Sequence, residues 1–521
     1  MGDTYPPNPP FEMDHTVEPT MTIGDWIRKW GLISPHKTAI IFEDKEWSYR
    51  ALNERANRLG GLLAELEVQK GDRVGVLLYN CPQYIEIYAA LAKVGAIAVP
   101  LNFRLVKSEL TSILDDSGSE TLLFGEDFGD RVEAIRHDIP VRRNRYVCVG
   151  GKTPSWSIDY EKTLNGYPPV EPKVKGGIAL GDPQMIMYTS GTTGVPKGAL
   201  LSHRKTLFNV LNANIYYGLV PGDIMLVARS LFNSGGMLVE CFPVLYKGGT
   251  VILQRRFNPE AVLEALGKYR VTIFEAAAAM YRMMLEECDI SQYDLTSLKV
   301  CYTGGERIPI SLLREYEERT ITICQIFGLT ETSTVTWLSK EDGVRKMGSV
   351  GRPVLHGEMR IVKEEGEGIR PGEVGEIIVG GPIIMDGYWN NSRLTEETIR
   401  DGWLHTGDLA TIDEEGFVYI KDRKKDMFIS GGLNVYPAEI EKVYLEHPKV
   451  SDVAIIGVPD PKWGEVGKAF IVLREGQAMI QQEAIDFCRE KIANYKIPKF
   501  VQFVDELPKT AAGKIRKYLL K

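Results

Sequence analysis

Long apolar runs and paired cysteines are both missing from this 521-residue sequence. No stretch approaches the roughly 18 apolar residues that a membrane-spanning helix needs, so we expect no integral membrane segment. The seven cysteines contain no C-x-x-C pair. An odd number of scattered cysteines predicts reduced thiols in a cytoplasmic protein, and it argues against a cysteine-ligated metal cluster.

Positive charge is in deficit as well, because 62 Lys and Arg residues face 70 Asp and Glu residues and the net charge is −8. This balance argues against broad binding to nucleic acid or to an anionic membrane. The first 20 residues are proline-rich and acidic, unlike a signal or transit peptide, and predict an extended arm. We therefore predict a cytoplasmic location, and assembly as a homodimer remains open.

The chain is too long for a single hydrophobic core, so two or more domains are expected. Its first part alternates between strand and helix patterns, as in "DRVGVLLYN", "QYIEIYAALAKVG" and "AIAVPLN". The alternation returns between "GTVILQ" and "IPISLLREYEER". Such alternation predicts an α/β fold with two layers of parallel sheet covered by helices.

The character of the sequence changes between residues 345 and 420, where short strand patterns are separated by glycine and proline. A small antiparallel β unit, similar to a barrel, is expected there. The charged run "KDRKKD" follows at residues 421–426, and about 100 residues come after it. The run is typical of a solvated loop or a linker, and the remainder is long enough for a small α+β domain.

Hydroxyl groups and glycines surround a single lysine in "MIMYTSGTTGVPKGALLSH" at residues 185–203. Glycines let backbone amides approach a ligand closely, and clustered amides together with Lys197 form an anion site. The spacing differs from that of a Walker A loop. The pattern favours a polyphosphate ligand over the alternative of a flexible glycine-rich turn.

This stretch resembles the phosphate loop of the adenylate-forming superfamily. That superfamily contains acyl- and aryl-CoA synthetases, peptide-synthetase adenylation domains and beetle luciferases. Further motifs occur in the family's order: "TGGE" at 303–306, "IFGLTET" at 326–332, "GYW" at 387–389, "GWLHTGDLA" at 402–410, "DRKKDMFISGGLNVYPAEIE" at 422–441 and "LPKTAAGKIRK" at 507–517. The ordered set covers nearly the whole chain and is highly specific.

The resemblance implies an enzyme that works in two steps with ATP, Mg²⁺ and CoA. A carboxylate attacks the α-phosphate of ATP to give acyl-AMP and pyrophosphate, and a thiol then displaces AMP. In the family, the residue that matches Lys514 bridges the carboxylate and the α-phosphate. Thr330 matches an α-phosphate contact, and Glu331 matches the Mg²⁺ ligand, for which a carboxylate is chemically suited.

The resemblance also implies a set of nucleotide-binding residues. Asp408 matches the carboxylate that accepts both ribose hydroxyls, and Arg423 matches a second ribose contact. Phe327 stands where the family more often has tyrosine, so a ring for stacking remains but its hydroxyl is lost. The full set is Thr189, Ser190, Gly191, Thr192, Thr193, Gly194, Lys197, Gly304, Gly305, Glu306, Phe327, Gly328, Thr330, Asp408, Arg423 and Lys514.

Matching the family's domains divides the chain into a large domain at 1–421, a hinge at 422–426 and a small domain at 427–521. Lys425 matches the pivot. Rotation of the small domain would clear Lys514 from the site before the thiol enters. Gly431 and Gly432 would then line the pantetheine tunnel.

The acyl pocket is the least constrained part of this expectation. Asn233 replaces a common histidine, and Ala277, Met280 and Gly304 are further candidates for the pocket wall. The segment "FEAAAAMYRMM" is equally consistent with a buried core helix. A medium- or long-chain fatty acid, or a cyclic or aryl acid, fits better than acetate. No single arginine or aspartate marks a dicarboxylate or an amino acid.

Three functions compete: an acyl-CoA ligase, a free-standing adenylating enzyme that loads a carrier protein, and a non-catalytic nucleotide-binding protein. The presence of Lys514, Glu331 and Asp408 together argues against the third. The partners expected are therefore a small carboxylic acid, ATP and CoA.

Overall fold

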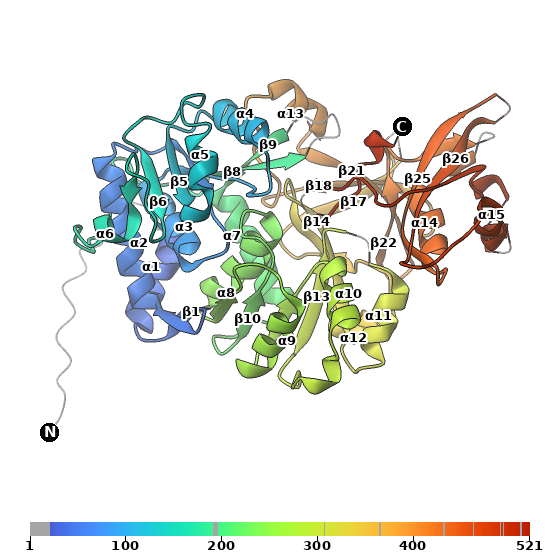
Figure 1. Ribbon diagram of the computed structural model, residues 1–521, viewed down its shortest axis with the longest axis horizontal. Helices are drawn as coiled ribbons and strands as arrows, with labels where there is room; N and C mark the ends of the chain where they lie inside the picture. Colours follow the sequence, from blue (N-terminus) through green and yellow to red (C-terminus); the bar gives the residue numbers. More distant parts are fainter. Residues whose placement is uncertain are drawn as a thin grey trace.

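The computed structural model describes residues 21–190, 196–306, 308–363, 366–430, 433–461, 463–489, 491–492, 494–510 and 513–520 (Figure 1). The predicted N-terminal arm, together with residues 191–195 and 431–432 of the predicted phosphate and pantetheine segments, lies outside these ranges. Within them the strands form four sheets.

The first sheet has nine strands, and its central strands are parallel. Antiparallel strands close both of its edges. In order across the sheet the strands are β16 (Arg352–Pro353), β15 (Ser333–Trp337), β14 (Ile323–Leu329), β13 (Val300–Gly304), β12 (Ile273–Glu275), β10 (Ile224–Val227), β11 (Thr250–Leu253), β1 (Thr38–Phe42) and β2 (Lys45–Ser48).

The second sheet has eight strands and is parallel from β4 to β7. Toward its other edge lie the antiparallel β8–β9 hairpin, which flanks the predicted phosphate loop, and the short edge strand β19. In order the strands are β19 (Gly387–Tyr388), β9 (Pro196–Ser202), β8 (Pro183–Ser190), β4 (Ile97–Pro100), β3 (Arg73–Leu77), β5 (Thr121–Gly125), β6 (Tyr146–Val149) and β7 (Ile158–Asp159).

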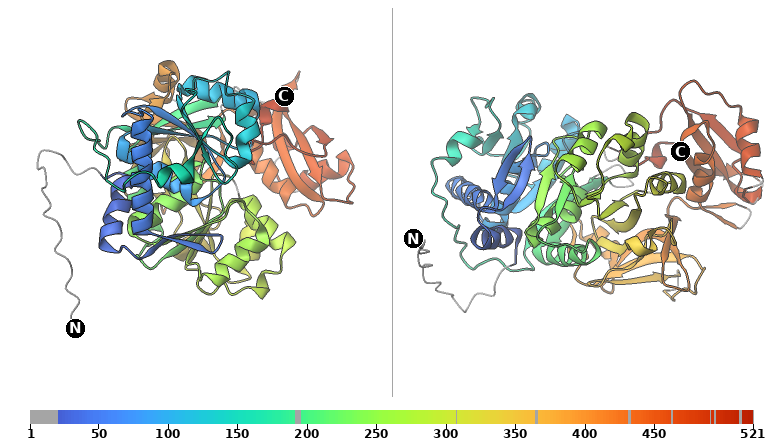
Figure 2. Two further views of the ribbon diagram at one scale, coloured as in Figure 1. Left: turned by 60° about the vertical axis from the view of Figure 1, so that its left-hand side comes forward. Right: turned by 90° about the horizontal axis from the view of Figure 1, so that it is seen from below.

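Helices between these two sheets bury one face of each in a shared core (Figures 1 and 2). They are α1 (Ile23–Ile33), α2 (Tyr49–Glu65), α3 (Pro82–Val94), α7 (His203–Tyr216) and α8 (Phe242–Lys247), with α6 (Tyr160–Leu164) alongside. The outer face of the first sheet packs against α9 (Pro259–Lys268), α10 (Ala278–Glu287) and α11 (Ile310–Glu317). The outer face of the second packs against α4 (Lys107–Ser117) and α5 (Gly129–Glu133). The result is a layered α/β body.

The glycine-punctuated region forms the expected antiparallel β unit. Its strands are β17 (Glu358–Val362), β18 (Gly375–Gly380), β21 (Trp403–Ile412), β20 (Ile399–Arg400) and β22 (Val418–Arg423). The short helix α13 (Ser392–Thr398) contacts β20 and β21 of this unit, whereas α12 (Lys340–Gly343) contacts β14 of the first sheet. The last strand, β22, leads directly into the C-terminal part.

The C-terminal part has its own sheet and core and forms a separate unit at one end of the molecule (Figures 1 and 2). Its elements are β23 (Phe428–Ser430), β24 (Leu433–Val435), α14 (Pro437–Leu445), β25 (Val450–Asp460), β26 (Gly464–Leu473), α15 (Gln481–Arg489) and β27 (Phe500–Phe503). Periodicity suggested that Ile492 continues the helix of Ile485 and Cys488. That prediction is wrong, because α15 ends at Arg489, although Ile492 still packs on the same core.

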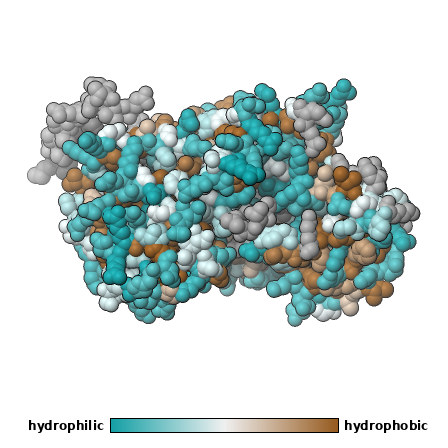
Figure 3. Space-filling view, turned by 90° about the horizontal axis from the view of Figure 1, so that it is seen from above, coloured by the Kyte–Doolittle hydropathy of each residue, from teal (hydrophilic) through white to brown (hydrophobic). Residues whose placement is uncertain are grey.

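The fold class predicted from the sequence is confirmed: a large α/β part with a small β unit precedes a small α+β part. Seen from above, the surface is mainly hydrophilic, and its hydrophobic residues gather toward the end that holds the C-terminal part (Figure 3). None of the described helices combines the length and the apolar character required to span a membrane.

Candidate active site

The candidate site lies where several neighbouring parallel strands of the first sheet end. Arg229 follows β10, Glu275 ends β12, Gly304 ends β13 and Phe327 lies near the end of β14. These strands are adjacent in the sheet. The carboxyl ends of parallel strands form a crevice in which ligands of α/β proteins bind, so this edge is the natural position for a site.

The predicted phosphate segment begins and ends in the β8–β9 hairpin. Thr189 pairs with Lys197, and Ser190 pairs with Pro196. The ammonium of Lys197 lies 5.5 Å from the centre of the Tyr388 ring. Gly191, Thr192, Thr193 and Gly194 lie outside the described residues, so their phosphate-binding role stays a prediction.

A tight hairpin between β14 and β15 presents Thr330 and Glu331 at its tip. The Leu329 N–H donates to the Thr332 hydroxyl oxygen at 3.1 Å, which closes the turn. A side chain at Gly328 would place its Cβ 2.0 Å from the Ser333 carbonyl oxygen, so only glycine fits there. The Thr330 hydroxyl lies 3.2 Å from that of Ser234.

Glu331 is held by one oxygen and by its backbone. The Tyr388 hydroxyl donates to Oε1 at 3.0 Å, and the Met385 N–H donates to the Glu331 carbonyl at 2.7 Å. Within the described ranges Oε2 accepts no hydrogen bond. No group of three or more metal-ligating side chains occurs in the same ranges. One available carboxylate oxygen is what a Mg²⁺ ion needs when phosphates and water complete its shell.

Asp408 and Arg423 are register partners on the adjacent strands β21 and β22. Nε of Arg423 lies 2.7 Å from Oδ1 of Asp408. Oδ2 is buried and accepts no hydrogen bond from any described residue. Burial raises the pKa of Asp408 to about 6, although Arg423 and Lys514 pull it down. A buried acceptor without a hydrogen bond costs folding free energy, and a hydroxyl group of a ligand would supply the missing bond.

Lys514 reaches this region from the C-terminal part. Its N–H donates to the Thr510 hydroxyl oxygen at 3.1 Å, within a turn closed by the Thr510 N–H on the Lys514 carbonyl at 2.7 Å. The side chain is accessible to solvent, yet the surrounding protein lowers its pKa by desolvation and by repulsion from Arg423. Asp408, Glu331 and Glu306 oppose that shift. The structure thus brings Lys514 together with the predicted ribose and metal residues.

The "TGGE" segment lies at the end of β13, beside the start of α10. A Cβ at Gly304 would meet the Ile326 carbonyl oxygen at 2.9 Å, so close strand packing explains this glycine. Gly305 is exposed and has a φ of +86°. Oε1 of Glu306 accepts a hydrogen bond from the Ala279 N–H at 3.3 Å, next to the start of α10.

Phe327, predicted to stack on the adenine ring, is only partly buried. It packs against the core of the antiparallel β unit. Its stacking role stays a prediction.

Most candidate acyl residues are half-buried, whereas other residues of α10 belong to the hydrophobic core. Ala277 and Met280 are half-buried at the start of α10, and Asn233 is half-buried before a π-helical turn at Gly235–Cys241. The same helix buries Tyr281 and Met284 in the core. The core-helix interpretation is therefore correct for one face of α10, and the pocket interpretation stays open for the other.

The predicted hinge is a turn directly after β22. The Asp426 and Met427 N–H groups both donate to the Arg423 carbonyl, at 3.0 and 3.2 Å. Lys425 itself is exposed. Gly431 and Gly432 lie outside the described residues, so the pivot and the tunnel both stay predictions.

Sequence reasoning missed several residues that support the site. Tyr388 belongs to the quoted "GYW" motif, but its bond to Glu331 spans 57 residues and leaves no local signal. Lys205 is buried beneath the hairpin and donates to the Ser333 hydroxyl oxygen, and burial lowers its pKa to about 7. Arg229 pairs with Glu275 at 2.8 Å. The only available signal for Arg229 was its position just after a buried strand.

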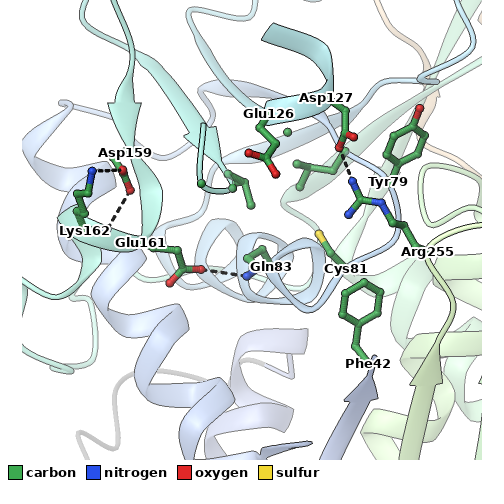
Figure 4. Close-up of a pocket in the computed structure, with 15 residues that line it drawn as sticks. Phe42, Tyr79, Cys81, Gln83, Glu126, Asp127, Asp159, Glu161, Lys162 and Arg255 are labelled. Carbon is green, nitrogen blue, oxygen red and sulfur yellow. Dashed lines mark hydrogen bonds and ion pairs between the residues drawn. The ribbon is translucent and has the colours of Figure 1, made fainter. Parts of the chain in front are cut away.

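A separate cavity of about 420 Å³ lies at the carboxyl ends of β3, β5 and β6 in the second sheet (Figure 4). Tyr79, Glu126 and Gly150 line it. Asp127 and Arg255 form an ion pair at its rim. It contains none of the predicted nucleotide-binding residues.

Known proteins resemble this chain along nearly its whole length. Feruloyl-CoA synthase of Amycolatopsis sp. is 39% identical over 496 residues, which is 95% of this chain and 97% of the relative. Indoleacetate–CoA ligase of Aromatoleum aromaticum is 36% identical over 501 residues, again 95% and 97%. The structure of o-succinylbenzoate CoA synthetase from Bacillus subtilis with its acyl-adenylate intermediate superposes with a TM-score of 0.85, at 33% identity, over 95% of this chain and 97% of that one.

Two family models cover most of the chain. The model described as AMP-binding enzyme matches residues 28–389, and the model described as AMP-binding enzyme C-terminal domain matches residues 439–514. The superfamily predicted from the ordered motifs is thereby confirmed. The chain belongs to the AMP-binding enzyme family of adenylate-forming proteins.

Proposed function

We propose that this chain is an AMP-forming acid:CoA ligase that activates an aryl or cyclic carboxylic acid. The observation that carries the proposal is the meeting of Lys514 with Asp408 and Glu331 across the two parts of the chain. The site therefore contains the cation of Lys514, a carboxylate oxygen of Asp408 without a hydrogen bond from any described residue, and the carboxylate of Glu331, which is suited to a metal. That set matches a reaction between a carboxylate and a nucleotide.

The residues divide the work of the first step. Oδ2 of Asp408 accepts the ribose hydroxyls, while Arg423 holds Oδ1 in place. Thr330 contacts the α-phosphate, and Lys514 stabilises the charge that builds up between the attacking carboxylate and that phosphate. Loss of one such preorganised group typically costs ~10²–10³ in rate.

The metal requirement rests on Glu331. The Tyr388 bond to Oε1 leaves Oε2 without a hydrogen bond from any described residue, so that oxygen can take a metal ligand role. Mg²⁺, when bound, would neutralise phosphate charge and orient the leaving pyrophosphate. ATP, Mg²⁺ and CoA are the expected co-substrates and cofactor, in keeping with the related structure of o-succinylbenzoate CoA synthetase in complex with ATP and magnesium ion.

The class of acid is supported by the relatives. Their names specify feruloyl, indoleacetate and succinylbenzoate groups, all of which contain a ring. An aryl acid is therefore preferred, and a medium- or long-chain fatty acid is the second candidate because Met280 is adaptable. A carrier protein as acyl acceptor is the alternative to CoA.

The domain division at 1–421, 422–426 and 427–521 forms part of the proposal, with Lys425 as the pivot. The turn after β22 supports it, because Lys424 and Lys425 are exposed there, although the Lys424 N–H donates to the Gly407 carbonyl at 2.8 Å. Gly431 and Gly432 would line the pantetheine tunnel after rotation. A cytoplasmic location and a homodimer stay predictions.

The test is incubation of the pure protein with ATP, Mg²⁺, CoA and a panel of aryl, cyclic and fatty acids. AMP and acyl-CoA should form only when both acid and CoA are present, and aryl acids should give the highest kcat/KM. Formation of ADP and phosphate with every acid would refute the mechanism. Acyl-AMP that no CoA releases would favour the carrier-protein alternative.

A further inference from the structure

A charged cluster lies beside the backbone of Gly235 and Gly305, next to the candidate acyl residues Asn233 and Gly304, and takes no part in the chemistry described above. Arg229, just beyond β10, places Nη1 2.8 Å from Oε1 of Glu275 at the end of β12. Its Nε is 3.4 Å from Oε1 of Glu240, which lies on the π-helical turn. The Tyr217 hydroxyl donates to the other oxygen of Glu275.

The arginine is the only member of this cluster that reaches the surface of the site. Both glutamate side chains are at most 1% exposed, whereas that of Arg229 is 19% exposed. Within the described residues no hydrogen bond occupies Nη2. The exposed part of the cluster is therefore a guanidinium edge with N–H donors to offer.

Two glycines show where that edge points. A Cβ at Gly235 would lie 2.5 Å from Cζ and Nη2 of Arg229, so the guanidinium packs flat on the backbone there. A Cβ at Gly305 would have Nη2 of Arg229 as its nearest atom, at 3.5 Å. Because Gly305 is exposed and follows β13, Nη2 faces the space between the "SLFNSGG" and "TGGE" segments.

We propose that Arg229 is a specificity-determining residue whose Nη2 donates a hydrogen bond to an uncharged oxygen on the ring of the acid. The inference rests on the proposed function and refines its substrate class. The acid would carry a hydroxyl, methoxy or keto oxygen away from its reacting carboxylate. Purely hydrocarbon acids would leave the guanidinium edge unpaired, which a buried donor does not tolerate well.

The charge of the cluster argues against a second carboxylate as the partner. Glu275 already compensates Arg229 at hydrogen-bond distance, and its other oxygen is held by Tyr217. Glu306 adds a further negative charge near Arg229. Burial raises the pKa of Glu240 well above its usual value, although the neighbouring Arg229 lowers it. An incoming carboxylate would compete with Glu275 and Glu306 for the same guanidinium, whereas a neutral oxygen needs only the N–H donor.

The experiment compares matched acids on wild type and on Arg229→Lys. The ring scaffold is the one that wild type activates best, substituted at the 3- or 4-position with hydroxyl, methyl or carboxylate. Wild type should prefer the hydroxyl acid over the methyl acid by about 10- to 150-fold in kcat/KM at one ring position, the range for a hydrogen bond to a charged donor. The carboxylate acid should not exceed the hydroxyl acid.

Arg229→Lys retains a positive charge for Glu275 but lacks the second N–H edge. The hydroxyl-to-methyl ratio should fall to about one, while the methyl acid keeps most of its wild-type kcat/KM. Arg229→Gln is the second variant, because its amide still donates toward Glu275, and the same loss of ratio is expected. Arg255→Lys is the matched control at the separate cavity of Figure 4 and should preserve the wild-type ratio.

The outcomes separate the inference from the function. AMP formation with any acid upholds the ligase, whatever Arg229 does. A wild-type enzyme without a hydroxyl preference, or an Arg229→Lys variant that keeps it, overturns the inference. An equal loss on all acids in Arg229→Lys also overturns it, because that is the result of a purely structural role.

Discussion

At the scale of single residues, Asp408 has an unfavourable environment in the protein that a bound ligand would relieve. One carboxylate oxygen is paired with Arg423, and the other is buried with nothing described to satisfy it. Burial of that carboxylate raises its pKa to about 6. A ligand hydroxyl that donates to Oδ2 would recover this free-energy cost.

The pH dependence of nucleoside binding follows from this arrangement. Adenosine has no phosphate to titrate, and its ribose hydroxyls should bind the ionised carboxylate. Its affinity should therefore fall up to about tenfold per pH unit below pH 6. Calorimetric titration between pH 5 and 8 measures the effect, and 2′-deoxyadenosine should bind more weakly throughout.

Asp408→Asn is the control, since its side chain does not titrate and its adenosine affinity should be low and flat with pH. The raised pKa also fixes the sign for stability. Between about pH 4 and 6 the folded protein holds a proton on Asp408 that the unfolded chain does not hold. Lowering the pH through this range therefore increases the contribution of Asp408 to the free energy of unfolding. Weaker adenosine binding at pH 5 is then not explained by unfolding. Constant wild-type affinity from pH 7 to 5 would contradict the role of Asp408.

Lys514 provides a second test at this scale. Lys514→Ala should lower acid-dependent ATP–pyrophosphate exchange by ~10²–10³, because a preorganised cation is lost from the reacting oxygens. Conversion of supplied acyl-AMP and CoA to thioester should continue at a useful rate. If both half-reactions declined equally, Lys514 would not be specific to adenylation.

Some residues that the structure brings together at the candidate site could be named from the sequence and others could not, for a physical reason. Lys514, Glu331 and Asp408 could be named because an ordered set of motifs contains them, and their roles stay predictions. Arg229 could not be named, because no local pattern tells a half-buried arginine from a surface one until the strands of Glu275 and Gly304 are placed beside it.

At the scale of elements, the β14–β15 hairpin sets the position of Thr330 and Glu331. Strand and helix alternation predicted the parallel strands correctly, since buried strands and amphipathic helices differ in period. The antiparallel return at β15 was not predicted, because its turn depends on close backbone contact at Gly328 rather than on a standard turn sequence.

Gly328→Ala tests the hairpin. The new Cβ would overlap the Ser333 carbonyl, and overpacking of this kind costs about 1–3 kcal/mol or more. We expect Tm to fall by a few degrees and adenylation to fall at least about tenfold. Gly181→Ala is the matched control, because its Cβ would meet nothing within 4 Å. Wild-type adenylation by Gly328→Ala would show that the hairpin tip tolerates displacement.

At the scale of the whole molecule, two separately packed parts both contribute residues to the candidate site. The cores of the layered body and of the C-terminal part are distinct, yet Lys514 lies among residues of the large part. The sequence indicated two parts through its charged run. It could not indicate which of the two faces of the small part meets the site, because that choice depends on contacts such as Arg282 with Ser451.

Lys425→Pro tests whether the parts rotate about the turn at 422–426. Proline fixes φ near −65° and removes an N–H, and among the described residues the Lys425 N–H has no backbone partner to lose. Adenylation should survive, because Lys514 already reaches the site, whereas thioester formation should fall at least about tenfold. Unchanged rates for both half-reactions, with unchanged Tm, would return the charged run to the role of a solvated loop.

The most direct test of the acyl-adenylate mechanism is to follow the oxygen atoms of the carboxylate into the products. An aryl acid labelled with ¹⁸O in both carboxylate positions is incubated with the protein, ATP, Mg²⁺ and CoA, and the products are analysed by mass spectrometry. Attack of the carboxylate on the α-phosphate predicts AMP that carries one ¹⁸O, unlabelled pyrophosphate and acyl-CoA that retains the other. Label in inorganic phosphate, or unlabelled AMP beside labelled acyl-CoA, would contradict an acyl-adenylate mechanism.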